Sequence, residues 1–488
     1  MSIFFLSSGL FLGWSLGAND ASNVFGTAVG SRMLKFRTAA IWCSIFIVLG
    51  AAVSGAGPSR TLGKLGSVNA IAGAFTVALA AAISVYLMTS ARYPVSTSQA
   101  IVGAIIGWNL FSGSLTNYDS LTKIVMSWVV CPILAAGIAM ILYKLVAWFI
   151  MRFKIHMFTL DTLTRYGLIL VGAFGSYSLG ANNIANVMGV FVSVSPFPDI
   201  SIYGLFTLTS VQLLYLIGAM AIAFGVLTYS KRVMMTIGRG IMDLSPIAAF
   251  VVVLAHSIVL FLFASQRLES WLISWGLPPI PLVPVSSSQA IVGAIIGVGL
   301  LKGGRSIHWQ MLGGIASSWI ITPVIAAIIS FISLFFMQNV FQQQTYRPVK
   351  YMLTPAAIEH IREAGESTKA IEELQGKMFP NAISFKKALS KRIKLPHKTL
   401  ELIVTSAEIC KMKITEDKIA KINTGWITLE QKDVLKKLIG RCFVHKWMLD
   451  EALAKESPHW RPKENDRSYN NDLKNKLSYL YDLFQEMN

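Results

Sequence analysis

The chain contains one stretch of sequence twice: Pro94 to Gly107 reads PVSTSQAIVGAIIG, and Pro284 to Gly297 reads PVSSSQAIVGAIIG. We call this stretch the hydroxyl motif. Proline disfavours a helical conformation in the residue before it, so each copy is expected to begin in an extended conformation. Ser96 and Ser286 are then placed to cap a helix that continues through the apolar residues. The copies differ at one position, which predicts a structural unit that the chain uses twice.

Three further pairs of motifs occur in the same order along the chain. The first and second copies of the four motifs, taken in chain order and with the hydroxyl motif third, lie 163, 175, 190 and 191 positions apart. Two copies of one unit with loop insertions should give such a steady increase. We therefore predict an internal repeat. The pairs are Gly17–Asn23 (GANDASN) with Gly180–Asn186 (GANNIAN), Thr61–Lys64 with Thr236–Arg239, and Ser127-Trp128 before Pro132 with Ser318-Trp319 before Pro323.

The charged loops indicate how the two copies are oriented. The loop after the first GAN motif carries Arg32, Lys35 and Arg37, whereas its counterpart at 191–201 has no basic residue and contains Asp199. Basic loops lie on the cytoplasmic side of membranes. The two loops are therefore expected on opposite sides, which favours an inverted repeat with its N-terminus outside.

Composition places most of the chain in a membrane. Only 14% of all residues are charged, against about 25% in soluble domains. Residues 1–346 hold 17 of the 43 Lys and Arg and 6 of the 25 Asp and Glu. The basic residues there fall between apolar segments, which is typical of membrane loops and not of a nucleic-acid interface. Apolar runs of about the length that spans a bilayer are Ala39–Ala56, Ala70–Thr89, Lys123–Ile150, Phe206–Thr228, Leu244–Ser265 and Trp309–Val340; runs interrupted by Gly, Asn or Pro are Ser2–Val29, Val95–Leu110, Tyr166–Val194 and Val285–Leu301.

These patterns predict an all-α polytopic membrane protein of two inverted repeats with broken or re-entrant helices, followed by a soluble helical domain. The expected divisions are a first transmembrane repeat at 1–150, a linker at 151–165, a second repeat at 166–343 and the C-terminal domain at 344–488. The sequence identifies neither a partner for this last domain nor the side of the membrane on which it lies.

The GAN motifs are candidates for binding a cation. Asp20 lies in a Gly-, Ala- and Asn-rich stretch of an apolar segment, and a buried carboxylate is costly unless it is paired, protonated or bound to a cation. We expect the helix to break at these motifs and to expose backbone carbonyls. Asn side chains add oxygen ligands that suit Na⁺; the alternative is Asn–Asn bonding between helices. The predicted cation set is Asn19, Asp20, Asn23, Asn182, Asn183 and Asn186.

The hydroxyl motifs are candidates for binding an anion. A helix that starts inside the membrane presents free N–H groups and the positive end of its dipole. The three consecutive hydroxyls of each copy, Ser96-Thr97-Ser98 and Ser286-Ser287-Ser288, add neutral donors. Two such helix starts near the midplane are typical of transporter sites built from broken helices. Ordinary helix capping in membrane turns is the alternative.

Other motifs carry less information. His256 lies in an apolar segment and is interpreted as a hydrogen-bonded interior residue, with a proton relay as the alternative. The four cysteines show no metal-binding spacing, and no set of nucleophile and base is visible, so an enzyme is not predicted.

At the GAN and hydroxyl motifs the chain resembles the inorganic phosphate transporter (Pit-type, sodium/phosphate symporter) family over about residues 1–340. This resemblance implies phosphate contacts by Ser96, Thr97, Ser98, Ser286, Ser287 and Ser288 with Asp20 and Asn183, and it adds Gln99 and Gln289 to the cation set. Two positions depart from the family pattern. Asn183 replaces an acid, and Gln99 and Gln289 stand where many members have His.

The resemblance implies a multi-pass transporter of the plasma or inner membrane, acting as a homodimer, that carries inorganic phosphate with a coupling cation. We favour Na⁺ over H⁺, because glutamine does not titrate, and expect no covalent cofactor. Asn183 leaves open a related sulfate permease. An anion channel and a receptor that signals through the C-terminal domain are rivals from other classes.

Overall fold

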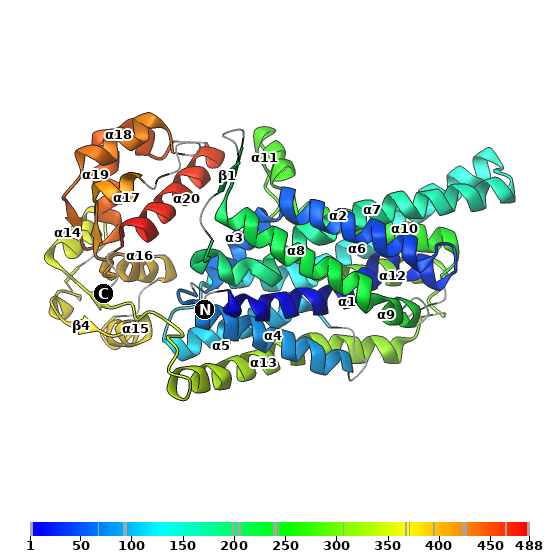
Figure 1. The fold of residues 1–488 in the computed structure, drawn as a ribbon, viewed down its shortest axis with the longest axis horizontal. Helices are drawn as coiled ribbons and strands as arrows, with labels where there is room; N and C mark the ends of the chain where they lie inside the picture. The colour runs from blue at the N-terminus through cyan, green and yellow to red at the C-terminus, as the bar shows by residue number, and fades with distance from the viewer. Residues whose placement is uncertain are drawn as a thin grey trace. The chain divides into compact units, whose positions relative to one another are not determined.

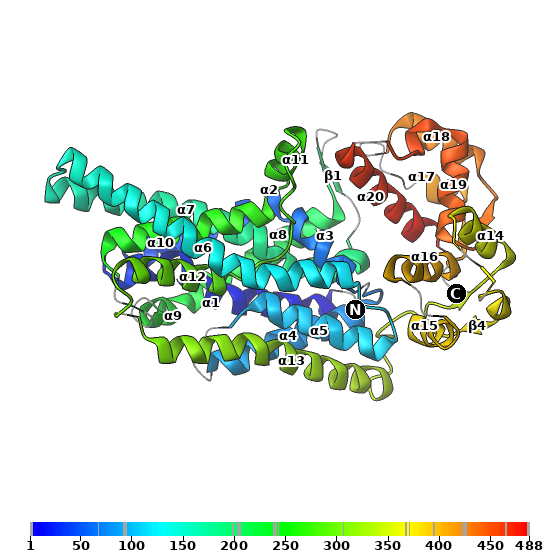
Figure 2. The same cartoon turned by 180° about the vertical axis from the view of Figure 1, so that it is seen from behind.

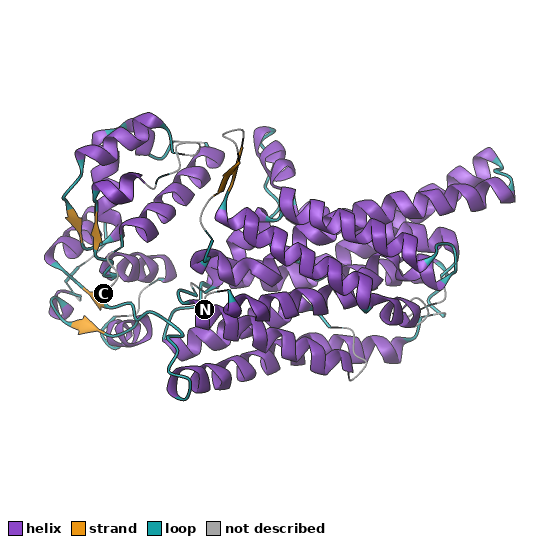
Figure 3. Cartoon of the chain, in the orientation of Figure 1, coloured by secondary structure: helices purple, strands orange, loops and turns teal. Residues whose placement is uncertain are grey.

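The computed structural model describes residues 3–66, 68–90, 95–197, 200–202, 206–237, 242, 244–305, 307–366, 368–369, 371–393, 396–420, 422, 427–463 and 466–485. The chain forms two compact units. Residues 1–111 and 116–347 form the first, which we call the membrane unit. Residues 112–115 and 348–488 form the second, the tail unit. Both units are mainly helical (Figure 3).

The membrane unit is a bundle of long helices joined by short connections (Figures 1 and 2). The elements are η1 (Phe4–Leu6), α1 (Ser7–Gly30), α2 (Phe36–Ser54), α3 (Ala56–Leu65), α4 (Ile71–Ser90), α5 (Thr97–Ser112), α6 (Tyr118–Phe153), α7 (Met157–Met188), η2 (Gly189–Val194), β1 (Ile200–Ile202), β2 (Phe206–Leu208), α8 (Ser210–Thr228), α9 (Ser230–Ile237), α10 (Pro246–Ala264), α11 (Gln266–Ser274), α12 (Ser287–Leu301) and α13 (Trp309–Asn339). Two short antiparallel strands, β1 and β2, place Ile200 opposite Leu208.

Seven helices of the described chain are long and apolar enough to cross a membrane: α2, α4, α6, α7 with η2, α8, α10 and α13. Each of the six uninterrupted apolar runs falls on one of them, which confirms the prediction of a helical membrane protein. The charged positions used to orient the repeat are described only in part, because Asp199 lies outside the described residues, as does Arg239 at the end of a repeated motif.

The GAN motifs do not break their helices, and this prediction is wrong. α1 runs without interruption from Ser7 to Gly30, and α7 from Met157 to Met188. The glycines instead allow neighbouring helices to pack closely. A methyl group on Gly17 would overlap the backbone of Ile222, and a methyl group on Gly180 would overlap the backbone of Ile47. The amide side chains of the motifs bond to groups outside their own helices, such as Ser287 and Val285, while both helices stay continuous.

The two copies of the hydroxyl motif do begin helices, as predicted. The backbone N–H of Gln99 donates to Ser96 Oγ at 3.3 Å, and that of Gln289 donates to Ser286 Oγ at 3.2 Å. Each serine therefore caps the first turn of the helix that follows, α5 or α12. Pro94, which opens the first copy, lies outside the described residues.

The tail unit contains two separate apolar cores, one with Phe385 and Leu389 and the other with Leu449 and Trp460. The elements of the first core are β3 (Tyr351–Met352), α14 (Pro355–Glu363), η3 (Glu372–Leu374), β4 (Met378–Phe379), α15 (Ala382–Ser390) and α16 (His397–Ala407). Those of the second are β5 (Met412–Lys413), α17 (Glu416–Ala420), α18 (Leu429–Lys437), β6 (Cys442–Phe443), α19 (Lys446–Glu456), η4 (Pro458–Trp460) and α20 (Arg467–Phe484).

The two parts of the tail unit contain the same local arrangement of a glycine turn and a short strand pair. Gly376 and Gly440 both have a positive φ, of 72° and 84°, and lie 64 positions apart. Each is followed by a short strand that pairs antiparallel with an earlier one, β4 with β3 and β6 with β5. The tail unit is therefore a second duplication, which the sequence analysis did not identify.

Candidate functional site

The structure gathers all fourteen predicted site residues into one buried region of the membrane unit. Each of these side chains is at most 5% exposed. They come from α1 and α7, which carry the GAN motifs, and from the starts of α5 and α12, which carry the hydroxyl motifs. Hydrogen bonds also bring His256 of α10 into this region. We call the fifteen residues the polar cluster: Asn19, Asp20, Asn23, Ser96, Thr97, Ser98, Gln99, Asn182, Asn183, Asn186, His256, Ser286, Ser287, Ser288 and Gln289.

Asp20 accepts hydrogen bonds from amides of both GAN motifs. Asn183 Nδ2 donates to its Oδ2 at 3.0 Å, and Asn19 Nδ2 donates to its Oδ1 at 3.3 Å. Among the described residues Asp20 forms no ion pair, and its side chain is only 3% exposed. Two neutral donors compensate part of the cost of burying a carboxylate, and a cation would compensate the rest.

The hydroxyl motif of each half bonds to the backbone of the other half. Ser98 Oγ donates to the Val285 carbonyl at 3.1 Å, and Ser288 Oγ donates to the Val95 carbonyl at 2.9 Å. These two bonds are equivalent under the repeat, since both pairs of positions are 190 apart. The starts of α5 and α12 are therefore held face to face.

The GAN motifs hold the hydroxyl motifs in place in the same crossed manner. Asn23 Nδ2 donates to Ser287 Oγ at 3.0 Å, and Asn186 Nδ2 donates to Ser98 Oγ at 2.8 Å. Asn182 also donates to the Val285 carbonyl at 2.7 Å. Asn182 Nδ2 also donates to Asn183 Oδ1 at 2.8 Å, but this bond lies within α7 and is not the expected Asn–Asn bonding between helices.

The six predicted hydroxyls do not have equal freedom to bind a ligand. Ser96 and Ser286 accept capping bonds, and the hydroxyl protons of Ser98 and Ser288 are donated to backbone carbonyls. Thr97 Oγ1 is buried and has no partner among the described residues. Its equivalent, Ser287 Oγ, interacts with two side chains, Asn23 and His256. Thr97 and Ser287 therefore keep hydroxyl protons that no backbone carbonyl accepts, as do Ser96 and Ser286, whose capping bonds use only an acceptor site.

Several other polar atoms of the cluster also lack a partner within the described part of the chain. A buried polar atom without a hydrogen bond costs about 1–3 kcal/mol, so such a concentration within one region favours a bound polar ligand. Three are amide oxygens, which are ligands that suit a hard cation such as Na⁺. These atoms are Gln99 Oε1, Asn186 Oδ1, Gln289 Oε1 and His256 Nδ1.

The described residues contain no group of three or more His, Cys, Asp and Glu side chains suited to a metal ion. A cation at the cluster would therefore be held by Asp20 together with neutral amide and hydroxyl oxygens. This ligand chemistry fits Na⁺ better than a transition metal, which prefers imidazole or thiolate ligands.

His256 is the member of the polar cluster that the sequence analysis did not assign to the site. Its Nε2 lies 3.0 Å from Ser287 Oγ, and its side chain is fully buried. The only sequence signal was a single histidine in the apolar run Leu244–Ser265, and such a residue has no periodic pattern that points to a site.

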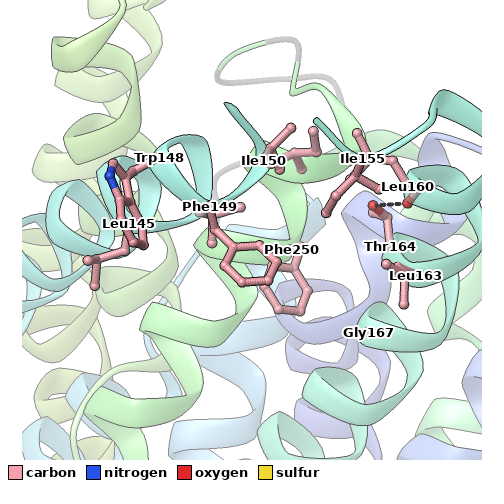
Figure 4. A pocket seen from close by; sticks show the side chains of 12 residues that line it. Leu145, Trp148, Phe149, Ile150, Ile155, Leu160, Leu163, Thr164, Gly167 and Phe250 are labelled. Atoms are coloured by element: carbon pink, nitrogen blue, oxygen red, sulfur yellow. Dashed lines mark hydrogen bonds between the residues drawn. The ribbon is translucent and has the colours of Figure 1, made fainter. Parts of the chain in front are cut away.

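A separate groove of about 450 Å³ lies between α6, α7 and α10 (Figure 4). Its lining is apolar, with side chains such as Trp148, Phe149 and Phe250. The single hydroxyl in the lining belongs to Thr164, which donates to the Leu160 carbonyl at 2.7 Å. Because no charged side chain lines it, the groove does not suit an inorganic anion.

Comparison with known proteins decides the family. A family model described as the phosphate transporter family matches residues 16–269 and 280–485. The chain belongs to the phosphate transporter family. It is therefore a multi-pass protein of the cell membrane and not an enzyme. The match extends into the tail unit, beyond the residues at which the resemblance was recognised.

Two relatives and one solved structure agree with this assignment. A protein of Methanocaldococcus jannaschii named as a phosphate permease is 31% identical, and the alignment covers 66% of this chain and 93% of that protein. A protein of Thermococcus kodakarensis, also named as a phosphate permease, is 25% identical, and the alignment covers 66% of this chain and 94% of that protein. A solved structure described as the sodium-dependent phosphate transporter is 24% identical, covers 70% of this chain and 99% of that one, and has a TM-score of 0.55. At this identity it shows a shared fold.

Proposed function

We propose that this phosphate transporter is a symporter that carries inorganic phosphate together with a cation, with Na⁺ favoured over H⁺. The observation that carries the proposal is the position of Asp20. It is buried, it is bonded to Asn19 and Asn183, and it belongs to the same cluster as the starts of α5 and α12. One enclosed region thus offers a carboxylate for a cation and helix N-termini for an anion.

The two ligands would assist each other's binding. A cation beside Asp20, with the unpartnered oxygens of Gln99, Asn186 and Gln289 as further ligands, cancels the negative charge of the carboxylate. An anion can then bind nearby without repulsion from Asp20. Thr97 and Ser287 would donate hydroxyl protons to phosphate, and the N-termini of α5 and α12 add favourable dipoles. Coupling follows, because neither ion is well accommodated alone.

Alternating access would follow from an inverted repeat. The crossed bonds between Ser98 and Val285 and between Ser288 and Val95 support a two-fold relation between the halves. Rocking of one part against the other would then expose the cluster to each side in turn. A homodimer, which the resemblance implies, completes the proposal, and the particle mass in lipid nanodiscs tests it.

Uptake by the purified protein in proteoliposomes tests the function. Radiolabelled phosphate should accumulate against its gradient when an inward sodium gradient is imposed, and should not do so with choline in place of sodium. Equal uptake in both conditions would reject coupling to Na⁺, and flow only down the phosphate gradient would indicate a channel.

Competition by sulfate tests the cargo in the same preparation. A tenfold excess of sulfate should leave phosphate uptake almost unchanged; strong inhibition, together with direct uptake of labelled sulfate, would favour a sulfate permease. Removal of residues 348–488 should leave some transport, as expected if the tail unit regulates the protein or binds a partner rather than forming the pathway.

A further inference from the structure

Only the second half of the repeat places a histidine beside its hydroxyl motif. Residues 74–80 of α4 read AFTVALA and residues 249–255 of α10 read AFVVVLA, 175 positions apart, so five of seven positions are identical. At the next position the first half has Ala81 and the second has His256. Both side chains are fully buried. The polar cluster is therefore asymmetric at this position.

This asymmetry changes the state of one hydroxyl. His256 Nε2 lies 3.0 Å from Ser287 Oγ. The equivalent hydroxyl of the first half, Thr97 Oγ1, has no partner among the described residues. Thr97 is thus free to rotate its proton toward a ligand, whereas the proton of Ser287 depends on what the imidazole does.

The imidazole has two neutral forms with opposite consequences. If Nε2 carries the proton, it donates to Ser287 Oγ, which already accepts a bond from Asn23 Nδ2 at 3.0 Å. Both acceptor sites of the hydroxyl are then filled, and its own proton must point elsewhere. If Nδ1 carries the proton, Ser287 donates to Nε2 and has no proton left for a ligand. No described group bonds to Nδ1, so the protein itself does not fix either form.

We propose that His256 is a positioning residue: in the form with its proton on Nε2, it directs the Ser287 hydroxyl proton toward the transported anion. This proposal rests on the proposed function, in which Ser287 donates to phosphate. An anion that accepts the Ser287 proton stabilises this form of the imidazole, so loading of the site and the orientation of the hydroxyl are linked. In the first half Ala81 stands at the equivalent position, and the Thr97 hydroxyl orients without an imidazole beside it.

Substitutions at position 256 test the proposal by phosphate uptake in proteoliposomes. His256→Leu removes the donor to Ser287 but leaves the hydroxyl and its proton, so the half-saturating phosphate concentration should rise about threefold, less than the loss of a whole hydrogen bond to a charged group. His256→Gln keeps an N–H that can reach Ser287 and should restore a value near that of the wild type. Ser257→Ala is the matched control, because this buried hydroxyl on the same helix donates to the Val253 carbonyl at 2.6 Å and should leave uptake unchanged.

A double-mutant cycle separates positioning from general damage to the core. Ser287→Ala alone should raise the half-saturating concentration about tenfold, more than His256→Leu does, and adding His256→Leu to Ser287→Ala should cause no further rise. Maximal uptake per folded molecule should change little in all variants, with folding checked by size-exclusion profile and thermal transition.

The outcomes distinguish this proposal from the proposed function. If the wild type does not take up phosphate, the proposed function itself fails. If the wild type transports but His256→Leu has an unchanged half-saturating concentration, positioning by His256 is refuted. It is also refuted if His256→Gln is as impaired as His256→Leu, or if the effects of His256→Leu and Ser287→Ala multiply.

Discussion

Replacing Asp20 with asparagine removes the carboxylate of the polar cluster while keeping the shape of the side chain. A unit charge pair about 4 Å apart at an effective dielectric constant of about 20 is worth about 4 kcal/mol. Because 1.4 kcal/mol corresponds to tenfold in affinity, cation binding should weaken about a thousandfold. Sodium would then no longer bind at the concentrations that saturate the wild type.

The effect of this change on folding should be much smaller. The variant loses one acceptor for the amides of Asn19 and Asn183, which costs about 1–3 kcal/mol. It also removes the cost of burying a charge, which acts in the opposite direction. The purified variant should therefore keep a cooperative thermal transition, so loss of transport can be separated from loss of folding.

Sodium-driven uptake of radiolabelled phosphate measures the outcome. The Asp20→Asn protein should show no sodium stimulation, whereas Asp161→Asn, the same chemical change at an exposed acid of α7, should behave like the wild type. Unchanged sodium dependence in the Asp20→Asn protein would refute the assignment of Asp20 to the cation site.

Three further predictions follow from the contacts. Thr97→Val should raise the half-saturating phosphate concentration about tenfold in uptake assays, because it removes an unpartnered buried donor without changing size. Combining Asn183→Asp with Asp20→Asn should restore part of the lost sodium dependence, because the two positions match in the repeat and Asn183 Nδ2 lies 3.0 Å from Asp20 Oδ2. No recovery in the same assay would argue against a symmetric site. Burial raises the pKa of Asp450 to about 6, so the folded tail unit holds this proton more tightly than the unfolded chain does. The free energy of unfolding of the tail unit should therefore fall by roughly 2–3 kcal/mol as the pH rises from 4 to 7. Asp450→Asn should remove this pH dependence in hydrogen-exchange measurements.

The strongest sequence signals concerned the hydroxyl motifs, and the structure brings both copies into one buried cluster. Ser96 and Ser286 cap helices as predicted, because capping depends on local sequence. The motifs also meet, which the repeat made plausible but did not require. What the sequence did not reveal is the division of labour within each triplet: Ser98 and Ser288 bond to the opposite half, and this depends on tertiary packing.

Two expectations failed or were incomplete for physical reasons. Glycine at positions 17 and 180 suggested a broken helix. An intact helix also requires glycine where the backbone of a neighbouring helix lies in close contact with it, and this is the case at both positions. His256 is a hydrogen-bonded interior residue, as expected, but its place beside Ser287 could not be predicted, because Ser287 lies 31 positions away and no local pattern connects the two residues. The duplication in the tail unit was missed because the two copies share few residues apart from short stretches around Gly376 and Gly440.

A density map of the purified protein in sodium chloride and phosphate tests the central claim most directly, namely that the two helix starts and Asp20 form one ion site. We predict a tetrahedral density between the hydroxyls of Thr97 and Ser287, with a second, spherical density in contact with the Asp20 carboxylate. Phosphate bound elsewhere in the membrane unit, with the polar cluster occupied by water alone, would contradict it.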